Sequence, residues 1–131
     1  MNVSIKPGSN APAVVYGSGL VRYAEKVGST WVVEHLEDSQ ANFGASLDFD
    51  STGRPHVALR RVDGLWHLQK DSGLWNRTFV RGASAPETDF YELGRPIVRI
   101  DDTGHPAVLY VKVANTGAVS GGYELELARK N

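Results

Sequence analysis

The sequence has no cysteine and a single methionine. The lack of cysteine excludes a disulfide framework and thiol chemistry. No apolar run approaches the roughly 18–20 residues that a membrane-spanning helix needs. The first ten residues, MNVSIKPGSN, lack the apolar region of a signal peptide. We therefore expect no membrane partner and a cytoplasmic location by default, with secretion as the open alternative.

An excess of charge of either sign is also absent, because 14 basic and 15 acidic residues give a net charge of −1. Such a chain has no basic field to hold nucleic acid. No stretch of ten or more residues keeps a 3.6-residue apolar period, so we expect no helix. The length of 131 residues and the 41% of hydrophobic residues fit one globular domain over 1–131. An all-β fold is the prediction that remains.

The clearest pattern lies in residues 45–80, ASLDFDSTGRPHVALRRVDGLWHLQKDSGLWNRTFV. Leu47 and Phe49 alternate with polar residues, as in a strand with one buried face. Asp and Gly recur where the chain must turn, because Asp can bond its own backbone and Gly tolerates positive φ. An Asp-Gly pair at Asp63 is a strong hairpin signal. Four antiparallel strands are predicted at 46–50, 56–60, 65–70 and 74–80.

Weaker copies of this stretch lie on both sides of it. The phrase around Pro55 recurs around Pro106 as IDDTGHPAV, and more loosely around Pro12 as IKPGSNAPAV. The chain therefore divides into three repeats, 1–42, 43–93 and 94–131. The first two have four predicted strands each. The third has three, because the chain reaches Asn131 before a fourth.

Repeats of 40–50 residues with four strands each are typical of propeller blades. The pattern strand, D-x-x-G-x-P, strand, G-L-aromatic, strand, G-x-x-W, strand resembles the blades of bacterial β-propellers, lectin-like or sialidase-type. The turns before Trp31 and Trp75 resemble the Asp-box of sialidase-type propellers, although the first lacks the Asp and the second is one residue short. The alternative fold is a β-trefoil, which also has three repeats of four strands.

The resemblance implies an assembly as well as a fold. Three blades are too few for a ring, since known single rings hold about four to eight. Small lectins that build six-bladed rings from short chains are similar in this respect. We therefore expect a homodimer that closes a six-bladed ring.

Aromatic residues are the candidates for ligand contact, because a planar ring can cover the apolar face of a sugar. Trp31 and Trp75 occupy equivalent places in their repeats, which favours packing between blades over binding. Trp66 has Val21 at its equivalent place, so the repeat does not require it and a sugar contact is open to it. The predicted ligand-binding residues are Trp66, His67, Arg22, Tyr91, Trp31 and Trp75.

Catalytic and metal patterns are weak. His35, His56, His67 and His105 lack metal-ligand spacing, so we expect no metal and no cofactor. His56 and His105 flank prolines and are interpreted as turn or strand-edge residues. Asp50 is interpreted as a turn former, repeated by Asp101. A sialidase-like clamp for a carboxylate could be built from Arg60, Arg61, Arg77 and Arg99.

Such a clamp would also need a Tyr nucleophile and a Glu partner around one axis, and three blades supply only half of a ring. We therefore expect no catalysis and predict a carbohydrate-binding module. The alternative is a protein–protein interaction scaffold, and a glycosidase is less favoured.

Overall fold

The computed structural model describes residues 1–17, 19–37, 42–61, 63–82, 96–113 and 123–129. These residues form eleven β-strands and no helix, which confirms the all-β prediction. None of the described segments is therefore a helix long and apolar enough to cross a bilayer.

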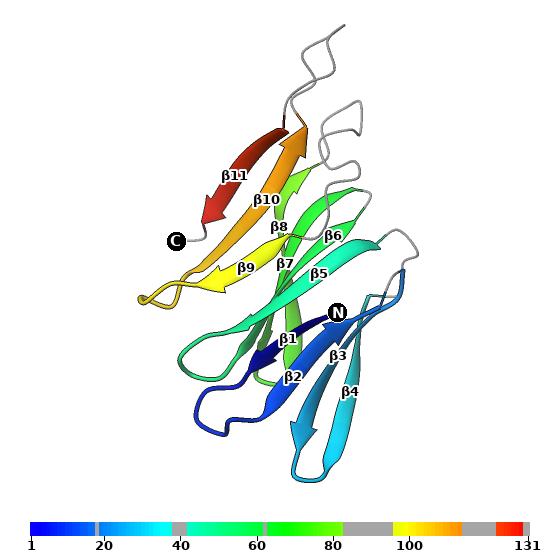
Figure 1. Ribbon diagram of the computed structural model, residues 1–131, viewed down its shortest axis with the longest axis vertical. Helices are drawn as coiled ribbons and strands as arrows, with labels where there is room; N and C mark the ends of the chain where they lie inside the picture. Colours follow the sequence, from blue (N-terminus) through cyan, green and yellow to red (C-terminus); the bar gives the residue numbers. More distant parts are fainter. Residues whose placement is uncertain (18, 38–41, 62, 83–95, 114–122, 130–131) are drawn as a thin grey trace, which may run out of the picture.

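The strands form three antiparallel sheets (Figure 1). The N-terminal sheet contains β1 (Asn2–Ile5), β2 (Pro12–Tyr16), β3 (Val21–Val27) and β4 (Thr30–Glu37). The middle sheet contains β5 (Asn42–Phe49), β6 (Pro55–Arg61), β7 (Gly64–Asp71) and β8 (Leu74–Gly82). The C-terminal sheet contains β9 (Ile97–Ile100), β10 (Pro106–Val113) and β11 (Tyr123–Arg129). Strands that follow one another in sequence are neighbours in each sheet, and no described strands close into a barrel.

The middle sheet is covered on both faces. Leu47, Leu59 and Leu68 face the N-terminal sheet and pack in one apolar cluster with its Val15 and Tyr23. The opposite face belongs to a second cluster, which is formed by Ala58, Leu65, Val98, Val108 and Tyr110. Because both faces are covered, every residue of β6 from Pro55 to Arg60 is buried. Polar side chains on this strand are therefore held inside the protein.

The first strands of the three sheets lie against one another (Figure 1). The backbone N–H of Leu47 in β5 donates to Asn2 Oδ1 in β1 at 2.8 Å. The backbone N–H of Val98 in β9 donates to Ser46 Oγ in β5 at 2.8 Å. Two successive junctions between sheets thus have the same hydrogen bond at the same place.

The turns before Pro55 and Pro106 have the predicted chemistry. The Oδ1 atoms of Asp50 and Asp101 accept hydrogen bonds from the backbone N–H groups two and four residues further on. Gly53 and Gly104 have φ angles of 82° and 84°, a conformation that favours glycine. The interpretation of Asp50 as a turn former, repeated by Asp101, is confirmed.

The strand register aligns the three sheets residue by residue. The marker prolines occupy equivalent positions, since the pairs across the first two strands are Ile5–Pro12, Phe49–Pro55 and Ile100–Pro106. In the outer strands, Trp31 pairs with Lys26 and Trp75 pairs with Lys70. Trp31 and Trp75 are therefore equivalent, as the sequence predicts.

The observed strand pairing shows that the predicted alignment of β3 with β7 was wrong by one residue. Val15 pairs with Tyr23, and its counterpart Ala58 pairs with His67, so Tyr23 rather than Arg22 corresponds to His67. Arg22 corresponds to Trp66. The predicted equivalence of Val21 and Trp66 aligns Gly19 with Gly64 and Arg22 with His67, but Gly64 is the first residue of β7 whereas Gly19 lies ahead of β3. In the C-terminal sheet, the residue that corresponds to His67 is Leu127.

Candidate functional site

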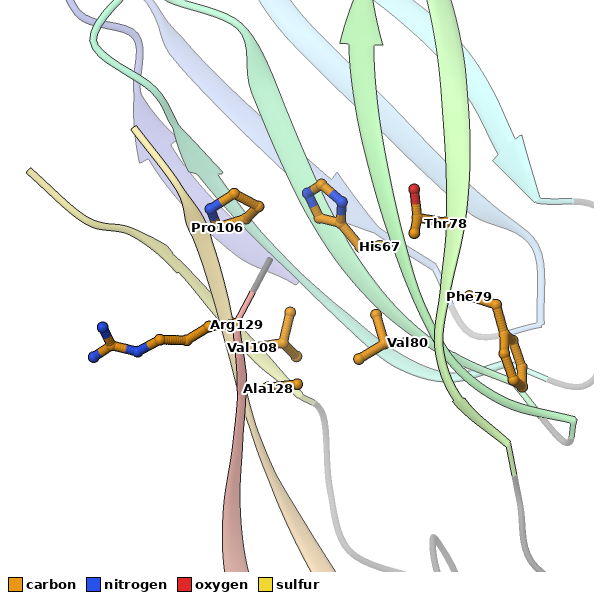
Figure 2. Close-up of a pocket in the computed structure, with 8 residues that line it drawn as sticks. All are labelled: His67, Thr78, Phe79, Val80, Pro106, Val108, Ala128 and Arg129. Carbon is orange, nitrogen blue, oxygen red and sulfur yellow. The ribbon is translucent and has the colours of Figure 1, made fainter. Parts of the chain in front are cut away.

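A cleft of about 180 Å³ lies between the middle sheet and the C-terminal sheet (Figure 2). We call it the inter-sheet cleft. It is smaller than the roughly 300–1,000 Å³ of sites for drug-sized ligands, so its size suits a single small ring. Its lining residues are His67 of β7, Thr78, Phe79 and Val80 of β8, Pro106 and Val108 of β10, and Ala128 and Arg129 of β11.

The lining has an apolar part and a polar part. Val80, Val108 and Ala128 lie together in Figure 2, and Pro106 lies beside the histidine ring. His67 and Thr78 occupy paired positions on β7 and β8 and bring an imidazole and a hydroxyl to the same wall. A small polar ligand with one apolar face therefore has both kinds of contact available.

His67 belongs to a buried polar chain. Asp50 Oδ2 lies 3.2 Å from His56 Nε2, and His56 Nδ1 lies 2.9 Å from His67 Nε2. All three residues are at most 3% exposed. An ionised Asp50 accepts only, so His56 donates through Nε2–H and its Nδ1 must accept from His67 Nε2–H when both rings are neutral. The chain thereby fixes the orientation and the tautomer of the histidine at the cleft.

The protonation states follow from burial and hydrogen bonding. Burial alone would raise the pKa of Asp50, but hydrogen bonds from Thr52, Arg54 and His56 hold that pKa well below its usual value. Burial lowers the pKa of His56 and outweighs the opposing hydrogen bond to Asp50. At neutral pH the carboxylate is therefore ionised and the His56 ring is neutral.

The structure separates Trp66 from His67. As neighbours on one strand, the two side chains point to opposite faces of the middle sheet. Trp66 packs against the cluster shared with the N-terminal sheet and donates from Nε1 to Asp63 Oδ1 at 3.0 Å. Its ring meets Phe79 edge-on with centroids 4.9 Å apart. In Figure 2 the Phe79 side chain points away from the other lining residues.

The other predicted binding residues lie elsewhere. Trp75 packs edge-on against Tyr23, with ring centroids 5.3 Å apart, at the junction of the N-terminal and middle sheets. Trp31 is half-exposed on the N-terminal sheet, with Lys26 Nζ 5.6 Å from its ring centroid. Arg22 lies on the same sheet, and Tyr91 lies outside the described residues. Of the five predicted ligand-binding residues that the structure describes, only His67 lines the inter-sheet cleft.

The proposed arginine clamp is not assembled. Arg60 lies on the face of β6 that is turned toward the C-terminal sheet, whereas Arg61 and Arg77 lie on the opposite side of the middle sheet. Arg77 donates to the backbone oxygen of Leu36. Arg99 is on β9 and donates to its neighbour Val98 O. Four arginines spread over different faces cannot hold one carboxylate.

Sequence reasoning missed His56 as part of the site. It was interpreted as a turn or strand-edge residue because it follows Pro55. It lies near the start of β6, in agreement with the predicted strand at 56–60, but it is only 1% exposed. A signal was present in the predicted hairpin. His67 pairs with Ala58, two residues from His56, and such diagonal neighbours share a sheet face. Among the described residues, no group of three or more His, Cys, Asp or Glu side chains could hold a metal ion.

Comparison with solved structures finds a likeness that extends over almost the whole chain. The chain is similar to a fucose lectin from Kordia zhangzhouensis, solved in complex with methyl-fucoside, with a TM-score of 0.55 and 16% sequence identity. The match covers 95% of this chain and 96% of that chain. At this identity the likeness concerns the fold alone, an arrangement of antiparallel β-sheets. No protein-family profile matches the sequence. No curated protein matches it either.

Proposed function

We propose that this protein is a non-catalytic carbohydrate-binding module and that its three sheets are three blades of a β-propeller. Within each sheet the strands follow one another up and down, and the sheets meet at their first strands. The lectin likeness extends over almost the whole of both chains. These observations support the propeller and the class of ligand together.

The inter-sheet cleft is the proposed sugar site, and its mixed lining is the observation that carries the proposal. Val108 and Ala128 offer an apolar surface to the C–H face of a pyranose ring, and Thr78 supplies a hydroxyl. His67, held through His56 by Asp50, supplies a ring of fixed orientation. A preorganised polar group loses little conformational freedom when it binds, which favours affinity. Trp66 is not part of this site.

Calorimetric titration with a panel of methyl glycosides, methyl-fucoside included, tests the proposal. We expect saturable binding of at least one of them and a weakening of about tenfold in Thr78→Val, since one hydrogen bond to a ligand hydroxyl is lost. Thr30→Val is the matched control, because Thr30 is exposed at the start of β4, away from the cleft. Equal affinity of the two variants would exclude this cleft as the site. If the wild type binds no glycoside of the panel and no glycan on an array, the protein-scaffold alternative is favoured.

A further inference from the structure

Two sheet faces at opposite ends of the arc carry exposed apolar side chains. The outer face of the N-terminal sheet presents Val3, Ile5, Trp31 and Val33, which are 46–59% exposed. The outer face of the C-terminal sheet presents Ile97 and Leu127, which are 40% and 52% exposed. We call these the leading face and the trailing face. We propose that the leading face of one copy packs against the trailing face of a second copy, and that two copies close a ring through two such junctions.

The repeat alignment identifies what the leading face lacks. Val3 corresponds to Leu47 and Val98, because these three residues lie two positions before the residue paired with the marker proline. Leu47 and Val98 are 1% and 0% exposed, since each packs against the preceding sheet. Val3 is 59% exposed. Val3 is thus an apolar side chain at a position that is buried in the other two sheets, and no sheet of the described residues covers it.

The trailing face shows the complementary deficit. Leu127 corresponds to Tyr23 and His67, which are 1% and 3% exposed beneath the following sheet. Leu127 itself is half-exposed. The two faces are therefore the two halves of one junction, and the chain builds that junction twice internally. A second copy offers each bare face the kind of surface that covers its counterparts.

The first internal junction gives the contact at atomic detail. Trp75 of the middle sheet meets Tyr23 of the N-terminal sheet edge-on, with ring centroids 5.3 Å apart. Trp31 is equivalent to Trp75, and Leu127 is equivalent to Tyr23. The proposal therefore places Trp31 of one copy over Leu127 of the other. It also gives Trp31 the inter-blade role that its counterpart Trp75 has within the chain.

The innermost contact is expected to be apolar. At the internal junctions Asn2 and Ser46 accept a hydrogen bond from the first strand of the next sheet. The equivalent position in the C-terminal sheet is Ile97, which has no acceptor in its side chain. Ile97 would lie against Val3 of the second copy instead. This contact would bury two apolar side chains, and neither of them has a hydrogen-bond acceptor that would need a partner.

Numbers favour two copies. Two arcs of three sheets give six, which lies within the four to eight blades of known rings, whereas three copies would give nine. An exposed apolar patch of this kind covers on the order of several hundred Å². A two-fold ring buries four such patches at once, a total near the roughly 1,600 Å² of a standard stable interface. Under two-fold symmetry, residue 3 of each copy contacts residue 97 of the other.

Sedimentation equilibrium of the full chain tests the assembly. The expected mass is twice the 14.3 kDa of one chain at micromolar concentration. Leu127→Glu places a charge in the junction and is expected to give a folded monomer, with its strand content checked by circular dichroism. Leu74→Glu is the matched control, because Leu74 is 70% exposed at the hairpin between β7 and β8, away from both faces. A monomeric wild type, a trimer, or a Leu127→Glu variant that stays dimeric would overturn the proposal.

The absence of native cysteine allows a direct test of which faces meet. Val3→Cys combined with Ile97→Cys is expected to give a disulfide-linked dimer on mild oxidation, since the equivalent internal positions are close enough for a side chain to accept from the opposing backbone N–H. Each single variant is expected to remain uncrosslinked. A covalent dimer from Val3→Cys alone would show that two leading faces meet, and would overturn the proposed arrangement. Neither measurement depends on a sugar, so failure of the assembly and failure of sugar binding are distinguishable.

Discussion

His56 and His67 stack on one face of the middle sheet, with ring centroids 5.2 Å apart and Nδ1 of the first 2.9 Å from Nε2 of the second. With Asp50 they form a chain in which one added proton reverses the direction of the hydrogen bond. A protonated His56 donates to both Asp50 and His67, and His67 then carries its own proton on Nδ1. The group at the inter-sheet cleft is thereby linked to a carboxylate that lies two hydrogen bonds away.

The buried His56 predicts a pH dependence of stability. Its pKa in the folded protein lies below the value of about 6.5 that it has in the unfolded chain. Just below pH 6.5 the unfolded chain therefore binds a proton at His56 while the folded protein does not. The contribution of His56 to the free energy of unfolding therefore has its maximum above pH 6.5, and it decreases as the pH drops toward 5. Urea denaturation of His56→Gln between pH 7 and 5 is expected to show a flatter dependence than the wild type. His105→Gln, which removes a histidine at an exposed position, is the matched control.

Asp50 and Asp101 form the same turn in two environments, which makes them a matched pair. Asp50 also binds Arg54 Nε at 2.8 Å and His56, and its side chain is 3% exposed. Asp50→Asn is expected to lower the free energy of unfolding by about 2–3 kcal/mol, because hydrogen bonds to a buried charge are lost. Asp101→Asn is expected to cost less, since that carboxylate is solvated. Chemical denaturation that finds equal losses would contradict the role given to burial.

The edge-on contact of Trp75 and Tyr23 predicts a measurable coupling across the first junction. A double-mutant cycle with Trp75→Leu and Tyr23→Leu is expected to give a coupling free energy of about 0.5–1.5 kcal/mol. The reason is that the edge of one ring faces the quadrupole of the other, in addition to the area that both bury. Strictly additive losses would show that the two rings stabilise their sheets independently.

Alanine substitutions at two glycines with positive φ distinguish the cost of backbone strain from the cost of a steric clash. Gly17 has a φ of 109°, and a Cβ there would lie 1.9 Å from the backbone oxygen of Leu20. Gly8 has a φ of 86° with open space around the same position. Gly8→Ala is expected to cost about 1–2 kcal/mol from conformation alone, and Gly17→Ala clearly more because the chain must move. Thermal unfolding that ranks them in the reverse order would contradict the turn geometry after β2.

The alternation of Leu47 and Phe49, the Asp-Gly turns and the spacing of the marker prolines were enough to predict an all-β chain with four, four and three strands. These features are local, because turn residues and strand periodicity act within a few residues. The site depends instead on which faces of neighbouring sheets meet. That is why Trp66 was placed with His67 although their side chains diverge.

The site prediction was wrong partly because the sequence alignment of β3 with β7 was shifted by one residue. Aligning Gly19 with Gly64 moved Arg22 into the place of Tyr23, and in a strand a shift of one residue exchanges the two faces. His56 was missed for a related reason, since its role exists only once β6 is buried on both sides. A proline before a strand indicates where the strand begins, and does not indicate what covers it.

The position of the inter-sheet cleft has a consequence for avidity. In the proposed two-fold ring the cleft between the middle and C-terminal sheets would occur once in each copy, so the proposed dimer would present two identical candidate sites at a fixed separation. A surface that displays many copies of a glycan would engage both sites, and the second binding event would occur at the high effective concentration set by the first. A protein whose individual sites are weak would then distinguish a densely glycosylated surface from free sugar.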